Sequence, residues 1–292
     1  MRASFLNDSK ALSETVGLLR AADCTSEGVE AFRRAVERYN SSGIDLNVSA
    51  FPSLRQGFYS FGSMSQLVAA LPHKLCDTKH PYEFNCFDTV IAITADRLRV
   101  SRRDDEIVGP ILVPNNKTNG QFKISTVFNA KEAFMLAYPI WYRQITEGTL
   151  PKSTGDSRRP LTAALLRCHT LSTNGIDKDV GRAVIDSLRA SWKRQGLGFP
   201  KNVEVVLCHE VSVPKGLLCT AHAGVLVRRE RGYTYLEKAG GSGPFVRLDI
   251  EDRSDLFPWL SAIFEAGKFG YTHHFATFND TTISPLEVNK PQ

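Results

Sequence analysis

The sequence lacks the long apolar runs that would place it in a membrane or mark it for secretion. No run approaches the roughly 18 to 20 residues that a membrane-spanning helix needs. Residues 1–19 have no continuous apolar core of the kind found in signal peptides, and they carry Asp8, Lys10 and Glu14. We therefore expect no membrane span, and a protein that is either cytoplasmic or exported by a dedicated secretion system that reads no N-terminal signal.

Neither basic residues nor cysteines are concentrated in the chain. Its 292 residues include 36 basic and 31 acidic side chains, and the pairs of arginines are scattered, so we expect no nucleic-acid partner. The six cysteines contain no Cys-x-x-Cys pair and no regular spacing, which argues against a disulfide framework and against a zinc site. We expect no cofactor and no metal, and we expect most cysteines to be buried as small apolar side chains.

Hydrophobic periodicity predicts helices early in the chain and strands late in it. The predicted helices are two within residues 4–40, a short one near 63–71, and two at 161–171 and 177–195, the last ending at Gly196. The predicted strands are 203–213, a hairpin over 217–239, 244–250 and 271–283, with a helix beginning at Ser254 or Asp255 between the last two. This order indicates an α+β fold with antiparallel strands.

Cys86 lies where another helix, running to about residue 99, is predicted to begin. Asn85 can cap this helix, and Asp88 complements the positive end of its dipole. The first turn of a helix favours a thiolate, and its backbone N–H groups can bind an oxyanion. Tyr82 is a candidate oxyanion donor, and Asn85 a candidate substrate-binding residue. The alternatives are a plain buried cysteine at position 86 and a packed ring at position 82.

A nucleophilic cysteine needs a base, and His222 is the best placed of the seven histidines. It opens the predicted strand "HAGVLV", where an imidazole can reach a helix packed on the sheet, whereas His209 lies in the middle of its strand and should be satisfied in place. If residues 228–231 form the hairpin loop, His222 lies opposite Glu237, which could orient the ring. A slip of one residue would place Lys238 there instead.

These segments resemble a known enzyme family. "NCFDTVIAI" and "HAGVLV…YTYLEK" are similar to NlpC-type, papain-like cysteine hydrolases, many of which cleave amide bonds in peptidoglycan stem peptides. The resemblance implies a papain-like core in which the cysteine-bearing helix packs on an antiparallel sheet. It implies Cys86 as the nucleophile, His222 as the base and Glu237 as the orienting residue. "NC" stands here where the family usually has "DC".

The resemblance also implies a division of the chain. We expect an N-terminal helical region, residues 1–82, packed on a catalytic domain formed by residues 83–292. The cysteine and the histidine are much further apart than in compact members of the family, which implies a largely helical insertion at about 100–200. A second likeness, to an uncharacterised bacterial family, covers nearly the whole chain through "YN" at 39–40, "NC" at 85–86 and "FATFND" at 275–280, and it implies no activity.

The predicted function is that of a bacterial cysteine amidase or peptidase. The expected substrate is a peptide or a peptidoglycan fragment. If it is peptidoglycan, the missing signal suggests delivery as a secreted antibacterial toxin, with an immunity or inhibitor protein as a partner. Two alternatives stay open: a non-enzymatic binding module in which Cys86 is incidental, and a thiol acyltransferase that uses the same three residues.

Overall fold

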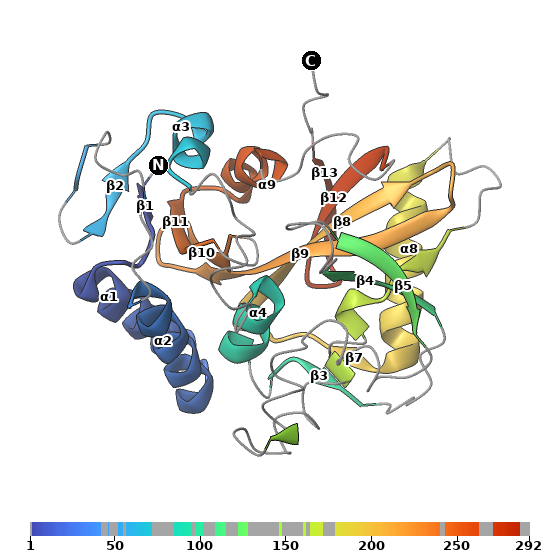
Figure 1. Cartoon of the computed structure of the whole chain (residues 1–292), viewed down its shortest axis with the longest axis horizontal. Helices are drawn as coiled ribbons and strands as arrows, with labels where there is room; N and C mark the ends of the chain where they lie inside the picture. The colour runs from blue at the N-terminus through green and yellow to red at the C-terminus, as the bar shows by residue number, and fades with distance from the viewer. Residues whose placement is uncertain are drawn as a thin grey trace.

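The centre of the protein is a nine-stranded antiparallel sheet (Figure 1). The computed structural model describes residues 2–41, 46, 52–54, 57–71, 85–94, 97–101, 109–114, 122–127, 146–147, 160–161, 164–171, 179–239, 243–262 and 271–286. Eight strands follow one another across the sheet in the order β13, β12, β8, β9, β10, β11, β1 and β2. The ninth, β6, pairs with the first residues of β9 along the edge opposite β8. The predicted α+β class is therefore confirmed.

The longest strands form the middle of the sheet. In chain order its strands are β1 (Arg2–Ser4), β2 (Tyr59–Ser60), β6 (His169–Thr170), β8 (Val203–Ser212), β9 (Leu217–Arg228), β10 (Tyr233–Lys238), β11 (Phe245–Ile250), β12 (His273–Phe278) and β13 (Thr282–Leu286). Two small antiparallel pairs lie outside it: β3 (Arg99–Val100) with β7 (Leu197–Gly198), and β4 (Gly109–Pro114) with β5 (Phe122–Val127). The predicted hairpin over 217–239 is present as β9 and β10.

Several helix ends lie where the sequence signals predict them. The helices are α1 (Ser9–Ala21), α2 (Ser26–Asn40), α3 (Met64–Ala69), α4 (Cys86–Thr94), α8 (Val180–Gln195) and α9 (Phe257–Ala262), the last preceded by the 3-10 helix η4 (Arg253–Leu256). The Thr25 hydroxyl accepts from Gly28 N at the start of α2. Gly196 ends α8 in the left-handed conformation that glycine adopts without strain, with φ of 63°. No helix in the described ranges is long and apolar enough to cross a membrane.

Side chains from the two faces of the sheet belong to two apolar clusters. On β9, Ala223 and Val225 join a cluster with α1, α2, α4 and α8, whereas Leu226 joins a cluster with α3 and α9. Alternate residues of a strand point to opposite faces, which explains this division. In Figure 1, α1, α2 and α4 accordingly lie on one side of β9 and β10, and α3 and α9 on the other.

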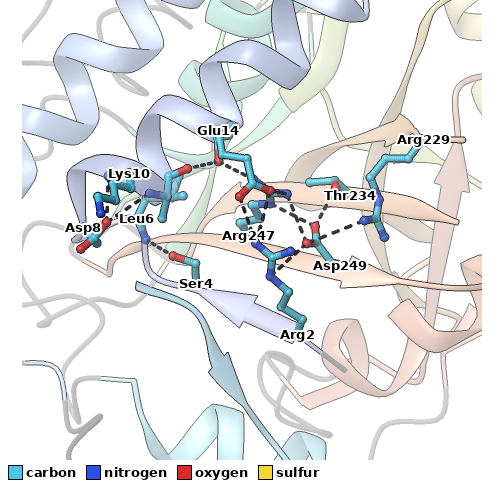
Figure 2. A network of polar contacts seen from close by, with 12 residues as sticks. Arg2, Ser4, Leu6, Asp8, Lys10, Glu14, Arg229, Thr234, Arg247 and Asp249 are labelled. Carbon is cyan, nitrogen blue, oxygen red and sulfur yellow. Dashed lines mark hydrogen bonds and ion pairs between the residues drawn. The ribbon is translucent and has the colours of Figure 1, made fainter. Parts of the chain in front are cut away.

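The N-terminal segment is joined to the sheet by a buried ionic network (Figure 2). Arg247 of β11, 2% exposed, donates from Nε to Asp249 Oδ1 at 3.0 Å and from Nη2 to Glu14 Oε1 of α1 at 2.8 Å. Its Nη1 donates to the Thr15 hydroxyl at 3.1 Å. Thr234 donates to the same Asp249 oxygen at 2.7 Å. Arg2 Nε and Arg229 Nη1 also approach Asp249 Oδ2, at 3.7 and 3.8 Å. The charge of the buried carboxylate is therefore compensated by three arginines, of which Arg247 is the most buried.

Several predicted boundaries are wrong, two of them because the residues concerned form strands and not the end of a helix. The predicted helix at 161–171 does not reach its end, since residues 169–170 pair with β9. The Cys86 helix ends at Thr94 rather than near 99, since residues 99–100 pair with β7. The last helical segment is capped by Asp252, not by Ser254 or Asp255. Residues 1–82 supply β1 and β2 as well as helices, and the described part of 100–200 includes the β4–β5 hairpin as well as α8.

Candidate active site

Cys86 is the first residue of α4, in the position that its sequence context predicts. Asp88 N donates to Asn85 Oδ1 at 3.0 Å, and Asn85 N donates to Asp88 Oδ2 at 3.0 Å, so the two side chains cap the helix reciprocally. The predicted cap is therefore confirmed, while the substrate-binding role of Asn85 stays a prediction. Cys86 is 7% exposed. Tyr82 lies outside the described residues.

His222 lies within β9 and not at the start of a strand, so that prediction was wrong. Pairing with β6 and β8 extends the strand back to Leu217. Cys208 pairs with His222 and His209 pairs with Thr220, which leaves Ala221 as an extra residue on β9. A bulge of this kind bends a strand locally and re-aims the neighbouring side chains. The imidazole is therefore placed by an irregularity that the sequence does not signal.

The imidazole of His222 contacts the carboxylate of Glu237, although the predicted register was wrong. Arg228 pairs with Tyr233, so the hairpin loop comprises residues 229–232, and Glu237 lies opposite Gly224. The register differs from the predicted one by two residues, which leaves Glu237 on the same face as His222. His222 Nε2 and Glu237 Oε2 are 2.6 Å apart. Lys238 does not take this place; its Nζ donates to the Gly243 carbonyl at 2.8 Å.

Two further side chains hold the Glu237 carboxylate, and sequence reasoning missed both. The Tyr235 hydroxyl donates to Oε2 at 2.6 Å, and Trp259 Nε1 of α9 donates to Oε1 at 3.0 Å. Tyr235 could have been found, because it stands two residues before Glu237 on the same face of β10. Trp259 gave no such signal, because it comes from a separate helix. Gly224 leaves room for the tyrosine: a Cβ there would lie 2.3 Å from the Tyr235 hydroxyl oxygen.

The thiol of Cys86 also lies within hydrogen-bonding reach of the imidazole. Burial by itself lowers the pKa of His222, but the charge of Glu237 and the proximity of Cys86 overcome this and raise the pKa to about 10. The neighbouring carboxylate and thiol therefore favour the protonated ring. A protonated imidazole beside a thiol is a common means of forming a reactive thiolate.

The neighbouring groups are held in uncharged forms. Cys208, opposite His222 on β8, is fully buried, and burial together with the nearby Glu237 and Cys86 raises the pKa of its thiol well above the ordinary value. His209 bonds the hydroxyls of Thr220 and Thr277 at 3.1 and 2.9 Å, which confirms that it is satisfied within the sheet. Burial lowers the pKa of His209 to about 3.

Two of the six cysteines are not free, contrary to expectation. Cys168 and Cys219 form a disulfide with a sequence separation of 51 residues. The pairing of His169 with Leu218 brings them side by side, and irregular spacing along the chain gave no sign of this. Among the described residues, no group of three or more histidine, cysteine, aspartate or glutamate side chains could hold a metal ion.

Comparisons with family models, with curated proteins and with solved structures give no match to this chain. The likeness to NlpC-type hydrolases therefore stays a prediction. The functional argument depends on the geometry of the site. A thiol, an imidazole and a carboxylate from α4, β9 and β10 form one hydrogen-bonded chain, at the boundary between the two apolar clusters.

Proposed function

We propose that this protein is a cysteine hydrolase that cleaves amide bonds, with Cys86 as nucleophile, His222 as general acid and base, and Glu237 as the residue that orients the ring. The observation that carries the proposal is the chain of contacts from the thiol through the imidazole to the buried carboxylate. Such a triad is recognised by its geometry and roles on unrelated folds. The packing of α4 on β9 and β10 is also compatible with a papain-like core.

The arrangement supports a two-stage reaction. The thiolate of Cys86 attacks the amide carbonyl carbon and forms an S–C bond, while His222 gives its proton to the leaving nitrogen as the C–N bond breaks. His222, now neutral, then takes a proton from the water that attacks the thioester, and the acid and the free thiolate are released. Backbone N–H groups at the start of α4 are suited to stabilise the negatively charged oxygen in both stages.

The proposed substrate class is a peptide or a peptidoglycan fragment, as the resemblance to NlpC-type hydrolases implies. An acyltransferase would use the same three residues and differ only in the second stage, where an amine or alcohol would replace water. Mass spectrometry of the products distinguishes the two, because hydrolysis adds the elements of water and transfer adds the mass of the acceptor.

One observation favours a non-enzymatic alternative. Cys86 is 7% exposed and His222 is 6% exposed, and the cysteine belongs to an apolar cluster. A buried polar chain of this kind can also serve to fix a unique packing of the core. In that case the fold would act as a binding module, and removing the thiol would change stability more than chemistry.

Turnover assays separate these possibilities. Purified protein is incubated with soluble peptidoglycan fragments and with peptide mixtures, and the products are identified by mass spectrometry. Cys86→Ala should abolish cleavage while shifting the melting temperature by only a few degrees. His222→Ala should also abolish cleavage, but with a larger loss of stability, because it leaves the Glu237 carboxylate buried without the imidazole. Cys24→Ala is the matched control, because it removes a partly buried free thiol outside the triad and should retain cleavage. Loss of folding in both triad variants, with no cleavage by the wild type, would favour the binding module.

A further inference from the structure

The two oxygens of Glu237 accept hydrogen bonds from donors of different kinds. Oε2 faces His222 Nε2 and the Tyr235 hydroxyl, and Oε1 faces Trp259 Nε1 at 3.0 Å. The Trp259 side chain is 0% exposed, so bulk solvent does not reach its N–H group. Its position is set by α9, which follows directly on η4, the 3-10 helix that the capping box of Asp252 and Asp255 begins.

These donors differ in whether they can reverse their role. A phenol hydroxyl can donate or accept, and a neutral imidazole nitrogen can do either according to its tautomer, but an indole N–H can only donate. Trp259 is therefore the partner that cannot adapt. An amide at position 237 would have to turn its oxygen toward Trp259, because placing its NH₂ there would bring two donors together. Its NH₂ would then face His222 Nε2.

We propose that Trp259 is a positioning residue that makes a carboxylate obligatory at position 237 and thereby keeps a proton on Nε2 of His222. With Nε2 protonated and held by Glu237, the Nδ1 atom is directed to Cys86. This inference rests on the proposed function for its catalytic meaning, but the tautomer that it predicts can be measured without a substrate. Within the described part of the chain, the other titratable groups near the ring are Cys86 on α4, Cys208 on β8 and Tyr235 on β10.

The test compares Glu237→Gln with the double variant Glu237→Gln/Trp259→Phe. Nitrogen-15 NMR of the His222 ring at pH 7.5 reports the tautomer, and the iodoacetamide alkylation rate of Cys86 reports thiolate formation. In Glu237→Gln we expect a neutral ring with its proton on Nδ1, and an alkylation rate at least tenfold lower, as expected for losing a charged hydrogen-bond partner. In the double variant the amide can turn, so the Nε2–H form should appear and the rate should recover several-fold.

Glu237→Gln/Tyr235→Phe is the matched control. The tyrosine hydroxyl can donate or accept, so its removal does not release the amide, and we expect neither a tautomer change nor a recovery of rate. An Nε2–H ring in Glu237→Gln with Trp259 intact would overturn the inference, and so would equal recovery in both double variants. The Glu237→Gln measurement tests the inference even if substitution of the buried Trp259 prevents folding. The proposed function fails separately, if wild-type Cys86 reacts no faster than Cys24.

Discussion

Replacing Gly224 by alanine should disrupt the site through packing alone. Gly224 lies on β9 opposite Glu237, and the ring of Tyr235 passes over its Cα. An added Cβ would lie 2.3 Å from the Tyr235 hydroxyl oxygen and 2.4 Å from Cζ, whereas ordinary contacts begin near 3.4 Å. Tyr235 is 0% exposed, so its ring has little space in which to move away.

The expected decrease in the free energy of unfolding has two parts. Forcing an extra carbon into a packed core costs about 1 to 3 kcal/mol. Moving the ring also breaks the 2.6 Å hydrogen bond from Tyr235 to the Glu237 carboxylate, and a hydrogen bond to a charged group contributes about 1.5 to 3 kcal/mol. We therefore expect Gly224→Ala to lower the free energy of unfolding by about 3 to 5 kcal/mol. The alkylation rate of Cys86 should fall as well, because Glu237 loses a partner.

Urea unfolding followed by tryptophan fluorescence measures the loss, with Gly17→Ala as the control. Gly17 is exposed in the middle of α1, and a Cβ there would meet nothing within 4 Å. That variant should gain about 0.5 to 1 kcal/mol, because alanine is the better helix former. In Gly224→Ala/Tyr235→Ala the clash is gone, so the double variant should cost clearly less than the sum of the single changes. Additive costs, or a loss under 1 kcal/mol for Gly224→Ala, would refute the reasoning.

Three other substitutions test the fold. Arg247→Met should cost about 1.5 to 3 kcal/mol in urea unfolding, because it removes hydrogen bonds to Asp249, Glu14 and Thr15 while Arg2 and Arg229 still pair with Asp249. Arg33→Met, at an exposed ion pair, should cost under about 1 kcal/mol; similar losses would contradict the network. Cys168→Ala opens the disulfide to Cys219 and should cost about 4 kcal/mol; an unchanged urea midpoint would contradict this. Burial lowers the pKa of His209 to about 3, so below about pH 6.5 the unfolded chain binds a proton that the folded protein does not, and the free energy of unfolding falls with pH. His209→Gln should make this fall less steep. An unchanged dependence of the free energy of unfolding on pH would refute the prediction.

Local signals were sufficient to predict much of the fold. The caps at Thr25 and Asn85 and the left-handed Gly196 each fix a helix end through a backbone requirement within a few residues. The errors fall where a distant segment competes for the same residues. Residues 99–100 and 169–170 continue helical patterns but pair as strands, because partners far along the chain are available to them.

The site was predictable where only the face of a strand mattered. The predicted register of the hairpin was wrong by two residues. Because every second residue of a strand lies on the same face, Glu237 still contacts His222. The bulge at Ala221 depends on how β8 and β9 align, which a single strand pattern does not contain. Trp259 reaches Glu237 only because α9 packs on that face of the sheet, so no spacing in the sequence could indicate it.

The pH dependence of Cys86 alkylation tests the central claim most directly. If the thiol and the imidazole of His222 form one reactive pair, wild-type Cys86 should react with iodoacetamide at pH 6 to 7 much faster than Cys24, whose thiol pKa is raised to about 11 by burial. In His222→Ala this rapid reaction should disappear, leaving a rate that rises only at alkaline pH. Equal rates and equal pH profiles for wild type and His222→Ala would contradict the account.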